Sequence, residues 1–261
     1  MAISKITRNI LISLGVIVVV TTVAVPSIVI PLRNNSNDTS TITFKLLYNA
    51  GVMIETEDTR IYIDPYNLDS SYSNLPADYI LITHPHGDHY DPASLNIIEY
   101  AETIYIMPDN MTVELASRGG IGVDPEDVLE FGSLTITPFY MYTLPVDIFP
   151  ASHPAEANWT SYNVDIDGFT FFHAGDSKNI AEYSQLTGLI DVAMLPLGPG
   201  CQTMTDMEVV NALNTIEASY FIPIHYGAGA CTTFIASFGS YIMSECQLIH
   251  LEYWATHIFE Y

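Results

Sequence analysis

The sequence predicts an α+β domain with the four layers of an αββα sandwich, in which two β-sheets pack face to face under helices on both outer sides. Two observations support this fold class. β-rich runs alternate with helical segments in both halves of the chain, as expected of two ββα halves packed together. With 261 residues, 49% of them hydrophobic, the chain can also fill one large core. We therefore expect a single domain over residues 41–261, after an N-terminal segment (1–33) and a polar linker (34–40).

The N-terminal segment is apolar from residue 10 to residue 32, with Lys5 and Arg8 in front of it. Such a run can cross a hydrocarbon core of about 30 Å as a helix. The positive charges predict that its N-terminus stays inside, which leaves the domain membrane-anchored and extracytoplasmic. A cleavable signal peptide ending near Ala24 is the alternative, and the domain would then be secreted. We favour the anchor, because the apolar run continues beyond Ala24.

The first half of the domain opens with three short β-rich runs, which the polar turns 49–51 and 57–59 separate into antiparallel strands. A buried strand and a helix follow, and Asp91 before Pro92 marks the start of that helix. The predicted elements are strands 41–47, 52–56, 60–63, 79–82 and 103–107 and helices 92–99 and 111–118.

The second half contains a strong hairpin signal at Asp167-Gly168, between strands 161–166 and 169–172. Thr205 marks the start of a helix over 206–216. The other predicted elements are strands 128–131, 134–140, 190–196, 219–223 and 247–252 and a helix over 231–243. The three cysteines do not form a disulfide framework, so we expect free thiols, with a Cys201–Cys231 bridge as the alternative.

Three histidines and an aspartate follow the predicted strand 79–82 closely, in the order His84, His86, Asp88 and His89. Buried imidazoles and carboxylates each need a partner, so this cluster would make a poor core. Both groups are ordinary metal ligands. In an extended turn His84 and His86 can point to one side, and Asp88 and His89 to another, which suits two adjacent ions. A solvated histidine-rich loop is the alternative.

The motif HPHGDH at residues 84–89 resembles the H-x-H-x-D-H signature of the metallo-β-lactamase superfamily. The flanking residues resemble its ascorbate-6-phosphate-lactonase-like branch of metal-dependent hydrolases. The resemblance extends from Thr41 to the C-terminus and implies the metallo-β-lactamase fold and a hydrolase activity. One departure is Asn49, where members often carry a histidine. Asp64 follows the third strand and either braces the metal-binding loop, as in relatives, or caps a turn.

The resemblance also implies the remaining ligands. His153 lies where the family places its third histidine, Gly175-Asp176 resembles the element whose aspartate bridges both ions, and His225 lies in the final ligand element. The implied centre has His84, His86 and His153 on one ion, Asp88, His89 and His225 on the other, and Asp176 between them. Two Zn²⁺ ions are expected, with Mn²⁺ or Fe²⁺ as alternatives. Otherwise Asp176 caps a helix that begins near Lys178, and His153 is structural.

A water between two such ions would have its pKa lowered toward about 7 and would attack as hydroxide. Asp88 is the expected catalytic residue, which orients this hydroxide or passes a proton to the leaving group. The expected reaction is hydrolysis of an ester-like bond in a small or lipid-derived substrate, which the branch resemblance makes lactone-like or phosphate-bearing.

Three other functions remain open. A membrane-tethered N-acyl-phospholipid phosphodiesterase shares the fold. A di-iron redox protein is disfavoured, because such relatives generally replace the second histidine of the motif by glutamate and His86 is present. A non-catalytic metal-binding module is disfavoured, because all seven ligand positions are intact.

The domain is strongly acidic. Residues 34–261 hold all 30 acidic side chains and only four of the seven basic ones. Nucleic-acid binding requires lysines and arginines that displace counterions, so we expect no nucleic-acid partner. The oligomeric state is left open by the sequence.

Overall fold

The computed structural model describes residues 40–261. The membrane anchor or signal peptide predicted at 1–33 lies outside these residues, as does the linker up to residue 39. Between residues 40 and 261, no helix combines the length and the apolar character that crossing a bilayer requires.

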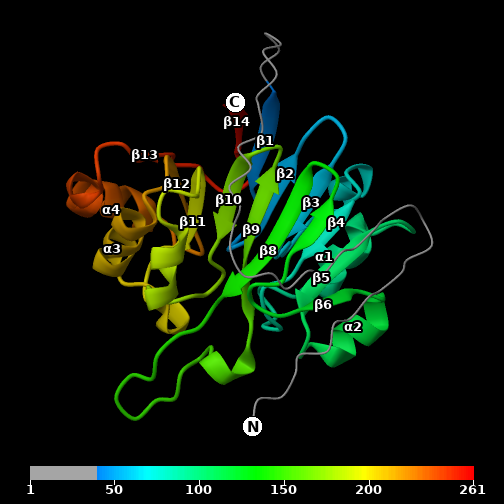
Figure 1. Cartoon of the computed structure of the whole chain (residues 1–261), viewed down its shortest axis with the longest axis horizontal. Helices are drawn as coiled ribbons and strands as arrows, with labels where there is room; N and C mark the ends of the chain where they lie inside the picture. Colours follow the sequence, from blue (N-terminus) through cyan, green and yellow to red (C-terminus); the bar gives the residue numbers. More distant parts are fainter. Residues whose placement is uncertain (1–39) are drawn as a thin grey trace.

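Two seven-stranded sheets form the centre of the domain (Figure 1). The first sheet has the order β14 (Thr256–Glu260), β1 (Thr41–Leu46), β2 (Val52–Glu55), β3 (Arg60–Ile63), β4 (Tyr79–Leu81), β5 (Ile104–Pro108) and β6 (Ile121–Val123). The second has the order β13 (Gln247–Leu248), β12 (Tyr220–Ile224), β11 (Val192–Pro196), β10 (Phe169–His173), β9 (Thr160–Ile166), β8 (Leu134–Tyr140) and β7 (Leu129–Phe131).

The two sheets repeat one plan. Antiparallel strands β1 to β3 continue into the parallel strands β4 to β6, and antiparallel strands β7 to β10 continue into the parallel strands β11 to β13. This repetition agrees with the two ββα halves that the sequence predicts. Because parallel strands end at the same edge of a sheet, the segments after β3 and β4 lie together, as do those after β10, β11 and β12.

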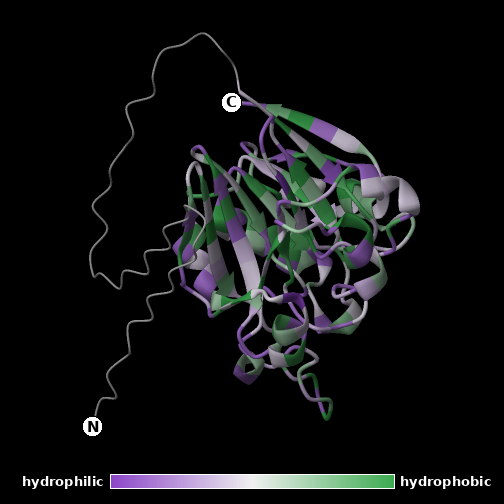
Figure 2. Ribbon diagram, turned by 90° about the vertical axis from the view of Figure 1, so that its right-hand side faces the viewer, coloured by the Kyte–Doolittle hydropathy of each residue, from purple (hydrophilic) through white to green (hydrophobic). Residues whose placement is uncertain are grey.

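Helices cover the outer face of each sheet, which completes the predicted four-layer sandwich (Figures 1 and 2). On the first sheet α1 (Pro92–Ile98) buries Leu95 and Ile98, and α2 (Thr112–Arg118) lies beside β5. On the second sheet α3 (Asp206–Ile216) and α4 (Ala230–Phe238) bury their apolar faces. The predicted caps are present, since Asp91 accepts from the N–H of Ala93 and Thr205 forms a capping box with Glu208.

Two predictions about single elements were wrong, and one alternative interpretation is excluded. The strand predicted at 247–252 is only two residues long, after which Ile249 and Leu251 are buried between the sheets and the chain crosses to β14 beside β1. The helix predicted at 231–243 ends at Phe238, and a 3₁₀ turn follows (Gly239–Tyr241). No helix begins at Lys178, since the next helical segment is a 3₁₀ helix over Ala181–Leu186. All three cysteines are free thiols, as expected.

Candidate metal centre

All seven predicted ligands lie at the edge where the parallel strands end. The loop after β4 carries His84, His86, Asp88 and His89; the loop after β10 carries Asp176, and His225 follows β12 directly. His153 comes from the long loop between β8 and β9, which projects from the lower edge in Figure 1. Residues from both sheets therefore meet in one cluster.

His84, His86 and His153 form one group of possible metal donors. The Nε2 atom of His84 lies 3.1 Å from Nδ1 of His86 and 3.2 Å from Nε2 of His153. Nitrogens bound to one tetrahedral zinc ion at the usual bond length would be about 3.3 Å apart. The three rings thus have a spacing that one zinc ion would fit.

Asp88, His89 and His225 form a second group. The Oδ2 atom of Asp88 lies 3.9 Å from Nε2 of His89 and 3.5 Å from Nε2 of His225. Asp176 stands between the two groups, because its Oδ1 is 3.2 Å from Nε2 of His89 and its Oδ2 is 3.5 Å from Nε2 of His153. This is the position that a carboxylate shared by two ions would occupy.

Three donor atoms of the cluster are buried without a hydrogen-bond partner: Nε2 of His89, Nε2 of His225 and Oδ1 of Asp176. Buried polar atoms are normally paired, because an unpaired one costs free energy. All three atoms belong to the second group or to the aspartate between the groups. The donor set therefore fits a bound cation.

Asp64 supports the rings of His84 and His89 at their Nδ1 atoms, directly for His89 and through Thr83 for His84. Its fully buried carboxylate accepts hydrogen bonds from the backbone N–H of Thr83 (2.8 Å), from the Thr83 hydroxyl (2.6 Å) and from Nδ1 of His89 (2.7 Å). Nδ1 of His84 lies 2.9 Å from the same hydroxyl. Asp64 therefore fixes which ring nitrogen of His84 and His89 faces the centre, which agrees with the first of its two interpretations, a brace of the metal-binding loop.

The pKa values differ between the two groups. Burial lowers the pKa of His84 well below its ordinary value, and that of His153 to about 4. Burial also acts to lower the pKa of His89, but the carboxylates of Asp176 and Asp64 outweigh it and raise that pKa well above its ordinary value. Burial acts to raise the pKa of Asp176, and the neighbouring histidines bring it down to about 2. The first group thus contains neutral imidazoles, the form that binds a metal, whereas His89 keeps a proton beside the ionised carboxylate of Asp176 and would release it on binding a cation.

The turn between β1 and β2 was not predicted to contact the ligands. Asn49 donates from Nδ2 to Oδ2 of Asp88 (3.1 Å), and its carbonyl accepts from the N–H of His225 (2.9 Å). His173, which is not one of the seven predicted ligands, places its Nε2 2.8 Å from the carbonyl of Ala50. The sequence marked Asn49 only as a departure from relatives, and gave no sign of these contacts.

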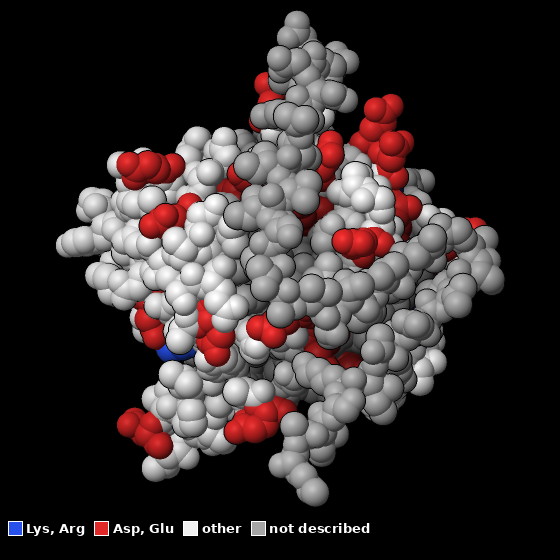
Figure 3. Space-filling model, in the orientation of Figure 1, with Lys and Arg blue, Asp and Glu red and all other residues white. Residues whose placement is uncertain are grey.

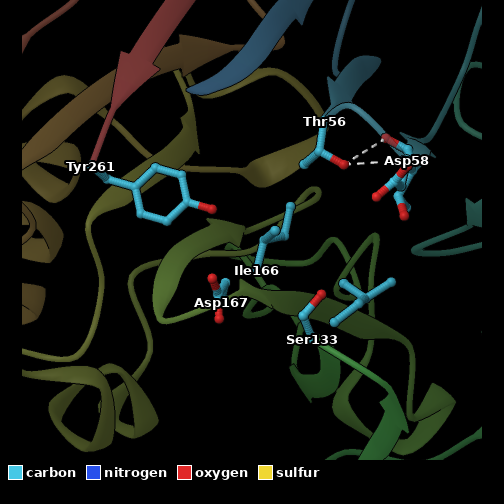
Figure 4. Close-up of a pocket in the computed structure, with 8 residues that line it drawn as sticks. Thr56, Asp58, Ser133, Ile166, Asp167 and Tyr261 are labelled. Atoms are coloured by element: carbon cyan, nitrogen blue, oxygen red, sulfur yellow. Dashed lines mark hydrogen bonds between the residues drawn. The ribbon is translucent and has the colours of Figure 1, made fainter. Parts of the chain in front are cut away.

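A separate hollow of about 130 Å³ lies at the opposite ends of the strands (Figure 4). It is lined by residues of hairpin turns and their neighbours, namely Thr56, Asp58, Thr59, Ser133, Leu134, Ile166, Asp167 and Tyr261. This lining includes no histidine, so the hollow lacks the donors that distinguish the metal centre.

Comparison with known proteins places this cluster in context. Residues 43–225 match the family model of the beta-lactamase superfamily domain. A UPF0173 metal-dependent hydrolase of Thermococcus kodakarensis is 31% identical over 202 residues, which cover 71% of this chain and 84% of that protein.

Two solved structures share the fold. Igni18, a metallo hydrolase of the archaeon Ignicoccus hospitalis, has a TM-score of 0.70 at 22% identity, covering 85% of this chain and 100% of that one. The metallo-beta-lactamase fold protein YhfI of Bacillus subtilis has a TM-score of 0.67 at 13% identity, covering 84% and 100%.

Proposed function

Since the chain belongs to the metallo-β-lactamase superfamily, we propose that it is a metal-dependent hydrolase that cleaves an ester-like bond at a centre for two zinc ions. The observation that carries this proposal is the arrangement of the seven side chains. They form two groups of three donors with Asp176 between them, and three of the donor atoms are buried without a partner.

Each residue has a role in this proposal. His84, His86 and His153 would hold one ion, Asp88, His89 and His225 the other, and Asp176 would contact both. When bound, the ions would supply an activated water and polarise the scissile carbonyl or phosphoryl oxygen. For an ester, the oxygen of water joins the acyl carbon, the acyl C–O bond breaks, and the leaving oxygen takes a proton.

We assign the transfer of a proton to the leaving oxygen to Asp88. Its side chain is 40% exposed, whereas His89 and Asp176 are buried, so it is the carboxylate of the set that an incoming substrate can reach. The amide of Asn49 donates a hydrogen bond to its Oδ2, and Nε2 of His225 lies 3.5 Å from the same oxygen. A positioned carboxylate of this kind can orient the attacking water and pass a proton to the leaving oxygen.

We also propose a location and a partner class. The apolar run at residues 10–32 supports a membrane-anchored, extracytoplasmic domain that acts on a small or lipid-derived molecule. Acidic side chains lie across the face seen in Figure 3, where few basic ones are visible. This surface argues against a nucleic-acid substrate.

Metal analysis of the purified full chain tests the centre. We expect about two zinc ions per chain in the natural sequence, and loss of both in His86→Ala and Asp176→Ala. His250→Ala is the matched control, because His250 pairs with Glu252 away from the cluster. Hydrolysis of lactones and phosphodiesters should disappear with the metal. Hydrolysis that survives complete metal removal would contradict the proposal.

A further inference from the structure

The basic side chains of the described residues are all engaged away from the metal centre. Arg60 pairs with Glu55, Arg118 pairs with Glu99, Lys178 pairs with Glu208, and Lys45 lies over the ring of Tyr72. Within residues 40–261, no hydrogen bond or ion pair joins any of these four cations to one of the seven clustered residues.

Lys178 is the cation nearest in sequence to the cluster, because it follows Asp176 by two positions. Its ammonium donates to the carbonyl of Thr203 at 3.0 Å and lies 2.9 Å from Oε2 of Glu208. It is mostly buried in this arrangement, with 15% of its side chain exposed. A substrate anion would have to compete with Glu208 for it, so Lys178 is not an available anion-binding group.

An aromatic ring, rather than a cationic side chain that could bind a substrate anion, lies beside the first group of donors. The ring of Trp159 is 5.4 Å from that of His84, 5.2 Å from that of His86 and 5.6 Å from that of His153. Trp159 is partly exposed, so it forms an apolar wall beside the first group of donors. Such a ring favours apolar or uncharged groups of a substrate.

An apolar loop, defined here as residues 144–149 and interrupted only by Asp147 among its side chains, belongs to the same β8–β9 connection as His153 and Trp159. Its exposed side chains are Leu144 (52%), Val146 (46%), Ile148 (89%) and Phe149 (62%). Large apolar side chains gathered in this way on a surface commonly mark a binding site.

The loop is held firmly to the centre. At its base the N–H of Thr143 donates to the carbonyl of His153, and the N–H of His153 donates to the Thr143 hydroxyl. At its tip Val146 and Phe149 exchange backbone hydrogen bonds. The same backbone that positions a donor histidine therefore presents the apolar side chains.

From these contacts we propose that the centre selects an uncharged ester or lactone with an apolar substituent, and discriminates against one whose substituent carries a phosphate or carboxylate. This inference rests on the proposed hydrolase function. An anionic substituent would meet no free lysine or arginine among the described residues and would approach a strongly acidic domain. An apolar substituent would lose its contact with water against Trp159 and the apolar loop.

Two lactones of equal length test the proposal, one with a methyl-ended alkyl chain and one with a carboxylate-ended chain. With the zinc-loaded full chain we expect kcat/KM to be at least about tenfold higher for the uncharged lactone at low salt, and the ratio to shrink as salt screens the charge. Trp159→Ala should reduce the preference at least about threefold. Trp254→Ala is the matched control, since this exposed tryptophan stacks on Tyr48 and contacts none of the donor histidines.

A binding measurement separates this inference from the proposed function. Calorimetric titration of the zinc-loaded chain with the matching pair of alkyl hydroxamates should show tighter binding of the uncharged one, whether or not lactones are hydrolysed. If neither lactone is hydrolysed but this preference holds, the proposed reaction fails and the inferred ligand class stands. Equal affinity for the two hydroxamates, or equal or faster hydrolysis of the carboxylate-ended lactone, overturns the inference.

Discussion

Replacing Asp64 by asparagine should weaken zinc binding without removing a ligand. The carboxylate accepts three hydrogen bonds, two from Thr83 and one from His89. Asparagine can still accept from the Thr83 N–H, but its amide NH₂ would face the Thr83 hydroxyl and the His89 ring, which both donate to Asp64. Two hydrogen bonds to a charged acceptor are therefore lost.

The size of the effect follows from these contacts. Hydrogen bonds to charged groups contribute about 1.5–3 kcal/mol each, so the two lost bonds amount to about 3–6 kcal/mol. A neutral amide is easier to bury than a carboxylate, which offsets part of this loss and leaves stability about 2–4 kcal/mol lower. Because the ring of His89 is no longer fixed, zinc affinity should fall by about 10–100-fold, or about 1.4–2.8 kcal/mol.

Two measurements check this prediction. Competition with a chromophoric chelator gives the zinc affinity, and urea unfolding in excess chelator gives the stability of the metal-free chain. Asp91→Asn is the matched control, because that carboxylate also accepts from a backbone N–H and from the hydroxyl of Ser94 but contacts no ligand. The control should lose stability and keep its zinc affinity. A folded Asp64→Asn variant with natural zinc affinity would refute the reasoning.

Three further outcomes are expected. Removal of metal by a chelator should lower the urea midpoint, and zinc at about 100 times its dissociation constant should restore about 2.7 kcal/mol per site. Gly175→Ala should lower the stability measured by thermal unfolding by about 2–4 kcal/mol, because φ is +56° and the new Cβ would lie 2.5 Å from the sulfur of Met141. Gly168→Ala is the control: φ is +87° there, but the new Cβ would meet open space, so the cost should be about 1 kcal/mol. Burial acts to raise the pKa of Glu208. Hydrogen bonds from the Thr205 N–H and from Lys178 to its carboxylate outweigh burial, and the net effect lowers the pKa below its ordinary value of 4.5. Its stabilisation is thus present above pH 4.5 and lost as the pH falls through the lowered pKa, so urea midpoints of Glu208→Gln should depend less on pH in that range.

The local parts of the fold were predictable because their signals are local. Caps at Asp91 and Thr205 and the turn at Asp167-Gly168 each depend on residues within a few positions, and the structure contains all three. Strand β14 was missed for the opposite reason. Its partner is β1, more than 200 residues earlier, and Thr41 opposite Glu260 leaves no mark on the sequence around either residue.

In the candidate site, too, the residues that are close in sequence were predictable and the distant contacts were not. The motif at residues 84–89 places four donors together by sequence alone, whereas spacing could not distinguish His153 from a lone structural histidine. Its position 3.2 Å from His84 comes from the return of the β8–β9 loop to the edge of the sheets. The support of Asp64 was one of two open interpretations, and its bonds to Thr83 and His89 decide between them.

The contacts that join the two sheets at the centre were the least predictable, because they use backbone atoms. The carbonyl of Asn49 accepts from the N–H of His225, and the carbonyl of Ala50 lies 2.8 Å from Nε2 of His173, so a turn of the first sheet contacts the ends of β12 and β10 in the second. Any residue has a carbonyl, and no pattern of side chains marks such a bond. The side-chain hydrogen bond of this turn, from Asn49 to Asp88, reaches the residue assigned to proton transfer. The β1–β2 turn therefore couples the position of that carboxylate to the packing of both sheets, and a change in the turn should alter proton transfer before it alters the fold.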